Sequence, residues 1–111
     1  MALIDRPVRG SRSGRPIMVL LDLLGRRWTM RVLWELRAEP LSFRALQAAC
    51  SGMSPSVLNQ RLAELREAAL VKGAENGYTL TPRGRELLGL FEPLSHWADA
   101  WAQDLRRAAS D

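Results

Sequence analysis

The chain has 111 residues, of which 47% are apolar and 25% charged, the composition of one globular domain with its own hydrophobic core. Its formal net charge of +4 and isoelectric point of about 10.5 suit a polyanionic partner. A single cysteine and a single histidine exclude an internal disulfide and supply no metal-ligand cluster or nucleophile–base pair, so we expect no metal, no cofactor and no enzyme.

No stretch approaches the roughly 18–20 consecutive apolar residues of a membrane span, and no basic-then-apolar signal segment is found near residue 1. We therefore expect a cytoplasmic protein without membrane contact. Residues 1–15 mix Gly, Ser, Pro and Arg without a period and are predicted to form a flexible basic arm. The arginines of this arm either reach DNA or have no fixed partner: Arg6, Arg9, Arg12 and Arg15.

Two short apolar helices are predicted next. Pro16 opens the first helix and Gly25 ends it, and Pro40 prevents the second helix from continuing. The apolar positions of the second helix fall on one face: Trp28, Met30, Leu33 and Trp34. We expect both tryptophans to belong mainly to the monomer core.

A third and a fourth helix follow a short extended step at residues 41–43. The third helix covers 43–50 and places Cys50 at an apolar position, where it is expected to be a small core residue and not a redox sensor. Ser54 is a favourable N-cap and Pro55 a favourable first residue for the fourth helix. Leucines at intervals of four and three residues set its buried face: Leu58, Leu62 and Leu65.

A β-hairpin and a long helix are predicted after the fourth helix. The pattern changes to a period of two around Asn76-Gly77, a turn sequence in which both residues favour a positive φ. Thr81-Pro82 then repeats the start of the fourth helix, and the last helix runs to about Arg107. Pro93 lies inside that helix and is expected to kink it or divide it in two.

Helix, tight turn, helix and hairpin, in this order, predict a winged helix-turn-helix, a mainly α fold with a small β-hairpin (α+β). The domain is expected to cover 16–108, between the arm at 1–15 and a tail at 109–111.

Four stretches, "LDLLGRRWTMRVLWEL", "LSFRALQAACSGMSPSVLNQRLAELREAALV", "YTLTPRGRELL" and "HWADAW", resemble the HxlR-type family of bacterial winged-helix transcription regulators. The resemblance covers about residues 16–101. It implies a homodimeric DNA-binding repressor or activator with the fourth helix as the recognition helix. It also implies a dimer interface between N- and C-terminal helices, formed here by Ile17, Leu20, Leu21, Leu94, Trp97 and Trp101.

The chain departs from the family pattern at three places. Arg15 stands where many members carry a reactive cysteine, so the usual thiol switch is absent from that position. The wing is short, and Glu75 at its tip would face phosphate unfavourably. Ala69 replaces the glycine that commonly ends the recognition helix, and because a left-handed alanine costs about 1 kcal/mol, the helix is expected to end differently.

The face of the fourth helix opposite the three leucines carries polar side chains. Asn59 or Gln60 can bond adenine in bidentate fashion, Arg61 can bond guanine, and serines near the helix N-terminus suit phosphate. The alternative is an ordinary solvated helix face with scattered surface charge around it. The predicted DNA-binding residues are Ser54, Ser56, Val57, Asn59, Gln60, Arg61, Lys72 and Arg83.

The sequence therefore predicts a homodimer that binds a pseudo-palindromic operator in double-stranded DNA as a sequence-specific regulator, with repression as the expected effect. The alternative is a winged-helix module for protein–protein interaction without DNA binding. The tryptophans raise a further hypothesis, a pocket between subunits for a flat aromatic effector, although packing explains the same residues without a ligand.

Overall fold

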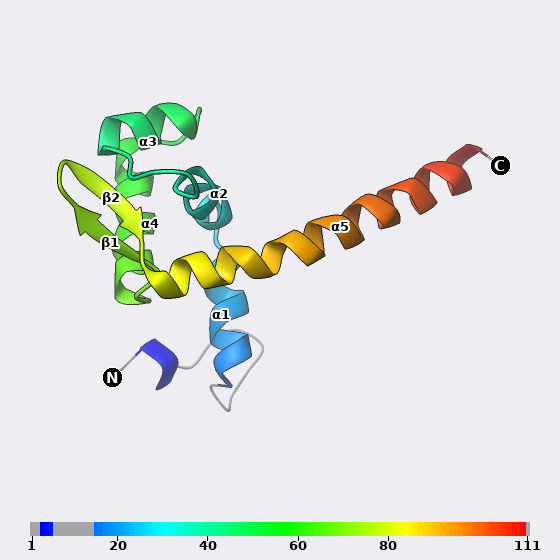
Figure 1. Cartoon of the computed structure of the whole chain (residues 1–111), viewed down its shortest axis with the longest axis horizontal. Helices are drawn as coiled ribbons and strands as arrows, with labels where there is room; N and C mark the ends of the chain where they lie inside the picture. Colours follow the sequence, from blue (N-terminus) through cyan, green and yellow to red (C-terminus); the bar gives the residue numbers. More distant parts are fainter. Residues whose placement is uncertain (1–2, 6–14, 111) are drawn as a thin grey trace.

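The structure, a computed structural model, describes residues 3–5 and 15–110. Figure 1 shows α2, α3, α4 and the hairpin gathered at one end, with α5 extending away from them; the whole molecule measures 52 Å along its longest axis. The order of elements confirms the predicted winged helix-turn-helix. The elements are η1 (Leu3–Asp5), α1 (Pro16–Leu24), α2 (Thr29–Glu35), α3 (Phe43–Ala49), α4 (Pro55–Glu67), β1 (Val71–Ala74), β2 (Gly77–Leu80) and α5 (Pro82–Ser110).

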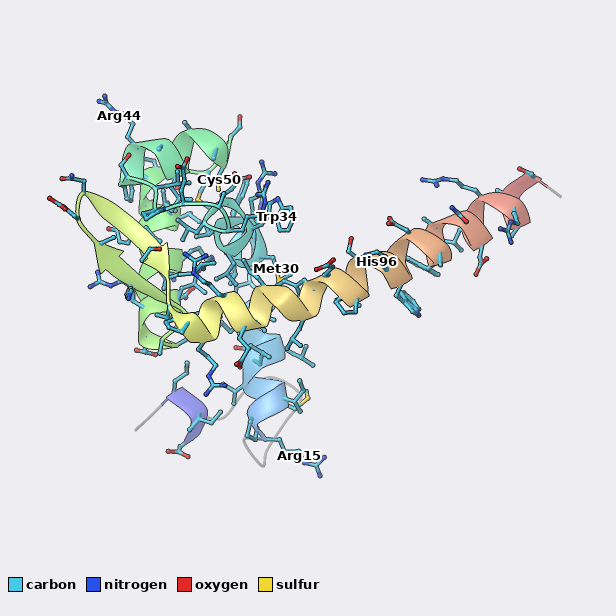
Figure 2. All side chains as sticks on the ribbon, viewed as in Figure 1. Arg15, Met30, Trp34, Arg44, Cys50 and His96 are labelled. Atoms are coloured by element: carbon cyan, nitrogen blue, oxygen red, sulfur yellow. The ribbon has the colours of Figure 1, made fainter. Side chains whose placement is uncertain are left out.

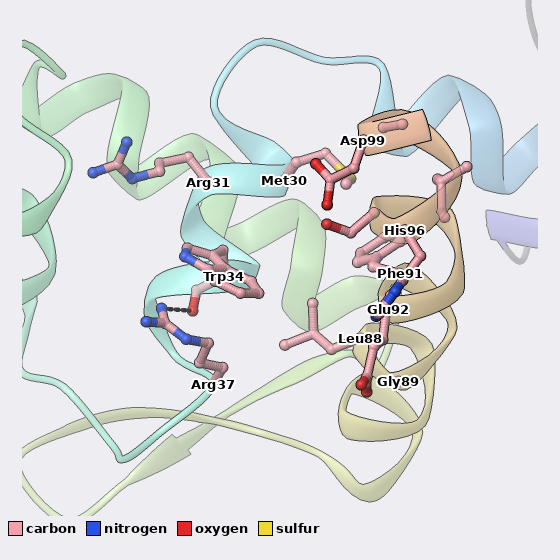
Figure 3. A pocket seen from close by; sticks show the side chains of 13 residues that line it. Met30, Arg31, Trp34, Arg37, Leu88, Gly89, Phe91, Glu92, His96 and Asp99 are labelled. Carbon is pink, nitrogen blue, oxygen red and sulfur yellow. Dashed lines mark hydrogen bonds between the residues drawn. The ribbon is translucent and has the colours of Figure 1, made fainter. Parts of the chain in front are cut away.

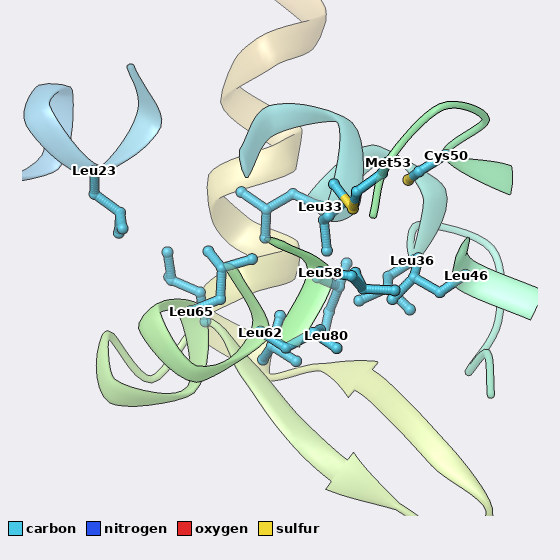
Figure 4. Close-up of a cluster of buried hydrophobic side chains, with 13 residues drawn as sticks. Leu23, Leu33, Leu36, Leu46, Cys50, Met53, Leu58, Leu62, Leu65 and Leu80 are labelled. Carbon is cyan, nitrogen blue, oxygen red and sulfur yellow. The ribbon is translucent and has the colours of Figure 1, made fainter. Parts of the chain in front are cut away.

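The core lies where α2, α3 and α4 meet the base of the hairpin (Figure 4). The three leucines predicted to bury α4 all do so: Leu58 and Leu65 are fully buried and Leu62 is 2% exposed. Burial of each such side chain contributes about 1.5–3 kcal/mol before the entropy cost of folding. The remaining members of the cluster are Leu23, Val32, Leu33, Leu36, Leu46, Cys50, Met53, Leu70, Val71 and Leu80.

Helix α2 is apolar on two faces, and the prediction that Trp34 belongs to the core is wrong. Leu33 is fully buried, whereas Met30 is 39% and Trp34 50% exposed. Trp28 is half-buried and packs against the core, as expected. The reason is that α4 and α3 cover only one side of this short helix, and the guanidinium of Arg37 covers part of the other, 4.0 Å from the Trp34 ring centroid.

The helix-turn-helix is α3, a turn and α4. The hydroxyl of Ser42 accepts the amide of Ala45 at the start of α3, and the hydroxyl of Ser54 accepts the amide of Val57 at the start of α4. Each cap satisfies an amide that the first helical turn leaves without a partner. Gly52 has φ +90° in the turn between them, a conformation that glycine adopts without strain.

The hairpin differs from prediction by one residue. Ala74 pairs with Gly77, so the two turn residues are Glu75 and Asn76, and Asn76 has φ 66°. Gly77 lies in β2 and is required for a different reason, since a Cβ there would lie 2.2 Å from the carbonyl oxygen of Leu41. Leu41 pairs with Tyr78, which confirms the predicted extended step beside the wing.

Helix α4 ends in the left-handed conformation that its sequence disfavours. Ala69 has φ 61°, its amide donates to Arg66, and the amide of Leu70 donates to Leu65. These two bonds form the Schellman motif that normally carries glycine. The expectation of a different helix end is therefore wrong, because the hydrogen bonds and the burial of Leu70 outweigh a backbone cost of about 1 kcal/mol.

Helix α5 is a single helix of 29 residues, roughly 43 Å long, and Pro93 does not divide it. A proline removes one intrahelical hydrogen bond and leaves the carbonyl four residues earlier, that of Gly89, without its donor. Because Gly89 is exposed, water can bond this carbonyl and the helix continues.

Candidate nucleic-acid interface

The open face of α4 carries short polar side chains. Ser56, Asn59, Gln60 and Ala63 are exposed, and within the part of the chain that the structure describes no hydrogen bond or ion pair engages Asn59 or Gln60. The hydroxyl of Ser54 already serves as the N-cap of α4, and it lies 3.3 Å from the hydroxyl of Ser56. This face can therefore offer amide donors and acceptors to a base edge and hydroxyls to a phosphate.

Two other predicted contact residues of α4 lie at the edge of this face. Val57 is half-buried and packs against the core, so only part of its side chain can reach a partner. Arg61 has a side chain only 15% exposed: its Nε donates to the carbonyl of Arg27 at 2.7 Å, and its NH1 pairs with Glu64 at 2.7 Å. Its guanidinium is already bonded within the protein and is not displayed on the open face.

Exposed basic side chains lie on the elements that precede and follow α4, among them Arg44 of α3 (Figure 2). Lys72 is exposed on β1, and Arg83 is exposed in the first turn of α5, where it pairs with Glu86. Both partners of that pair are more than half exposed, so it contributes little and leaves Arg83 able to bind an anion. Arg44 on α3 is a further exposed cation that sequence reasoning missed; its place beside the N-cap Ser42, off the face of the buried Leu46, was the available signal.

The basic arm lies largely outside the described residues. Arg6, Arg9 and Arg12 fall in this segment, and the predicted role of the arm stays a prediction. Arg15 is described: it is exposed and its carbonyl accepts the amides of Met18 and Val19 at the start of α1.

A second candidate surface runs along α5 and α1. The rings of Trp97 and Trp101 stack with centroids 5.8 Å apart and remain 63% and 52% exposed. Ile17 and Leu21 on α1 are exposed, and Leu20 is half-buried. We call the exposed apolar side chains of α5 the α5 stripe: Leu90, Leu94, Trp97, Trp101 and Leu105.

A hollow of about 820 Å³ separates α2 from the middle of α5 (Figure 3). Met30 and Trp34 line it from α2, and Leu88 and Phe91 face them from α5. Charged and polar groups lie at its rim, among them Arg37 and the exposed His96. Apolar walls with polar groups at the edge are typical of small-molecule sites.

Cys50 is fully buried in the core, which confirms the prediction that it packs as a small apolar residue. Burial raises the pKa of its thiol, the charge of Glu35 raises it further, and Arg31 opposes them. The thiol is therefore protonated at neutral pH and is a poor nucleophile. This cysteine is not suited to replace the reactive cysteine that Arg15 displaces.

In the described ranges, 3–5 and 15–110, no group of three or more His, Cys, Asp or Glu side chains is arranged to hold a metal ion. Across the same ranges, no helix combines the length and apolar character that crossing a membrane requires.

Comparison with known proteins identifies the family. The model of the HxlR-like helix-turn-helix family matches residues 23–106. YvaP, an uncharacterized HTH-type transcriptional regulator of Bacillus subtilis (strain 168), is 30% identical over 88 residues, which cover 73% of this chain and 82% of YvaP. The HTH-type transcriptional regulator YodB from the same organism is 28% identical over 89 residues, covering 74% of this chain and 80% of YodB.

Solved structures of transcriptional regulators share the fold of this chain. Quinone-bound YodB from B. subtilis superposes with a TM-score of 0.73 at 30% identity, covering 76% of this chain and 96% of that chain. A transcriptional regulator assigned to the MarR family, from Enterococcus faecalis V583, superposes with a TM-score of 0.74 at 26% identity, covering 92% and 99%. The chain thus belongs to the HxlR-like helix-turn-helix family of transcriptional regulators, DNA-binding proteins and not enzymes.

Proposed function

We propose that this regulator acts in the cytoplasm as a homodimeric repressor on a pseudo-palindromic operator. The observation that carries the proposal is the open face of α4, where the side chains of Asn59 and Gln60 are exposed and unbonded in the described part of the chain, above a fully buried leucine face. Bidentate amide–adenine contacts in a major groove require such an arrangement. Occupying an operator is sufficient to repress, whereas activation needs an added contact with the transcription machinery.

The dimer is supported by the α5 stripe. Large apolar side chains that repeat along one helix and stay half exposed or more in a monomer are typical of a buried interface. A dimer that reads two half-sites in successive major grooves must hold its two copies of α4 roughly 34–36 Å apart.

Selection of bound duplexes from a random pool tests the function directly. We expect an enriched motif with two-fold symmetry and half-sites one helical turn apart, and binding that weakens steeply as salt rises. The alternative, a protein–protein interaction module, predicts no enrichment above the starting pool at any salt concentration.

Gln60→Ala is expected to lower operator affinity about a hundredfold, roughly tenfold for each of the two half-sites, while leaving affinity for unrelated DNA unchanged, because each bidentate base contact is worth roughly 1–3 kcal/mol of discrimination. Competition gel shifts with specific and random duplexes measure both quantities. The matched control is Gln103→Ala, the same change at an exposed position of α5 outside the α5 stripe. Equal losses for specific and random DNA would contradict a base-reading role.

The second part of the proposal is a flat aromatic effector in the hollow between α2 and α5. Support comes from its aromatic walls, Trp34 and Phe91, from its size, and from the quinone bound by the related YodB. With Cys50 buried, such a ligand would be held by stacking and burial of its rings without a covalent bond.

Tetramethyl-1,4-benzoquinone is a suitable probe because its methyl groups block addition of thiols. We expect the NMR signal of the Met30 methyl group to shift on titration, while that of Met53, which is buried in the core, stays in place. Trp34→Ala should weaken the affinity for the probe about tenfold. An unmoved Met30 signal up to the solubility limit of the quinone would exclude the hollow as its site.

A further inference from the structure

Four charged side chains form a cluster at the junction of α1, the α1–α2 turn and α4. Arg26 pairs with Asp22 of α1 at 3.1 Å and with Glu64 of α4 at 2.9 Å. Glu64 pairs through its other carboxylate oxygen with Arg61 at 2.7 Å. The side chains are between 15% and 35% exposed, so solvent screens these pairs less than it screens an exposed pair.

The cluster has no net charge and includes one hydrogen bond to the backbone. Two arginines face two carboxylates, and the Nε of Arg61 donates to the carbonyl of Arg27 in the α1–α2 turn at 2.7 Å. Helix α4 is therefore joined to the α1–α2 turn by one hydrogen bond, from Arg61 to the carbonyl of Arg27, and by one ion pair, between Glu64 and Arg26.

Directional bonds on this side of α4 have a consequence for its open face. Apolar contacts of Leu58, Leu62 and Leu65 hold α4 to the core but are non-directional and permit small rotations about its axis. A rotation of 10–20° would displace the amides of Asn59 and Gln60 from bidentate geometry. The charge-assisted hydrogen bond from Arg61 to the carbonyl of Arg27 and the ion pair of Glu64 with Arg26 oppose such a rotation.

We infer that Arg26, Arg61 and Glu64 are positioning residues for DNA recognition: they fix the rotation of α4 relative to α1 and do not themselves contact DNA. The inference rests on the proposed function, since it assigns α4 the reading role. It also joins α1, which carries part of the proposed dimer surface, to the reading helix through Asp22.

Glu64→Gln distinguishes a positioning role from a simple charge effect, because the two predict changes of opposite sign in operator affinity. Removing a negative charge near DNA raises affinity by charge alone, whereas loss of the ion pair with Arg26 and weakening of the hydrogen bond from Arg61 misplace the reading face. We expect operator affinity to fall about tenfold, which corresponds to about 1.4 kcal/mol. The control is Glu75→Gln at the exposed hairpin tip, which removes the same charge and should leave affinity unchanged or raise it.

The salt dependence gives a second readout. Each arginine–phosphate contact contributes about 0.9 to the slope of log K against log salt, so an arginine that makes this contact in both subunits of the dimer contributes about 1.8. Arg61→Ala and Arg26→Gln should therefore lower operator affinity with an unchanged slope. Arg26→Gln combined with Glu64→Gln should cost no more than the worse single change, because both remove the same contact.

All binding measurements should be made well below the unfolding temperature of every variant, as determined by far-UV circular dichroism. A loss of affinity then cannot be caused by unfolding of the variant. If the wild-type protein binds no duplex, both the proposed function and this inference are wrong. Wild-type protein that binds an operator, with Glu64→Gln binding equally or more tightly, would overturn the inference alone. A slope lowered by about 1.8 in Arg61→Ala, about 0.9 for each subunit, would instead assign Arg61 a phosphate contact.

Discussion

Trp97→Glu is expected to convert the proposed dimer into monomers, raising the dimer dissociation constant about a hundredfold or more, which corresponds to about 3 kcal/mol. The physical reason is that a two-fold interface contains each changed side chain twice, so two carboxylates would be placed in an apolar contact. Trp97 is 63% exposed in the monomer and stacks on Trp101 of the same helix, so the fold should tolerate the change.

Sedimentation equilibrium measures the dissociation constant directly. Gln103→Glu is the matched control, since it adds the same charge to the same helix away from the α5 stripe and should leave the dimer intact. The monomeric variant should also lose most of its operator affinity, because two half-sites would no longer be bound together. A dimer unaffected by Trp97→Glu would exclude the α5 stripe as the interface.

Gly84→Ala is expected to destabilise the protein by about 3 kcal/mol, lowering the unfolding midpoint by roughly 15 °C. A Cβ at Gly84 would lie 2.2 Å from the carbonyl oxygen of Leu70, closer than any relaxed contact. The same carbonyl accepts the amide of Thr81 at 3.0 Å, and the hydroxyl of Thr81 donates to Ala69 at 2.7 Å. Moving α5 outwards to admit a methyl group would break this junction between the end of α4 and the start of α5.

Thermal and denaturant unfolding of Gly84→Ala should be compared with Gly89→Ala. Both glycines lie in α5, but a Cβ at Gly89 meets nothing within 4 Å. Gly89→Ala should therefore raise stability by up to about 1 kcal/mol through helix propensity alone. Similar effects of the two substitutions would show that the approach of Leu70 to Gly84 is not the reason for glycine at that position.

The start and the buried face of a helix were predictable from the sequence where residues within that helix determine them. Ser54 and Pro55 mark the start of α4, and the spacing of Leu58, Leu62 and Leu65 identifies its buried side without reference to any other element. The hairpin was predictable for the same reason, although its turn lies one residue earlier, because Gly77 serves the approach of Leu41 and not the turn.

The candidate site was only partly predictable. The exposure of Asn59 and Gln60 follows from the leucine spacing, whereas the position of the Arg61 side chain does not. A helical wheel places Arg61 at the flank of the open face. Only in the folded chain does the α1–α2 turn lie beside α4, where the carbonyl of Arg27 accepts from Arg61 and the guanidinium of Arg26 pairs with Glu64.

By itself, the sequence determined the order of elements, the helix caps, the buried leucine face and the family, because these depend on spacing and on bonds between residues a few positions apart. Only the tertiary structure decided which of two apolar faces of α2 is buried, leaving Trp34 at the hollow, and which glycines are required by close backbone approaches. It also decided that Arg61 is bonded to the α1–α2 turn. The physical reason is that such choices depend on groups more than ten residues away, whose positions no local pattern encodes.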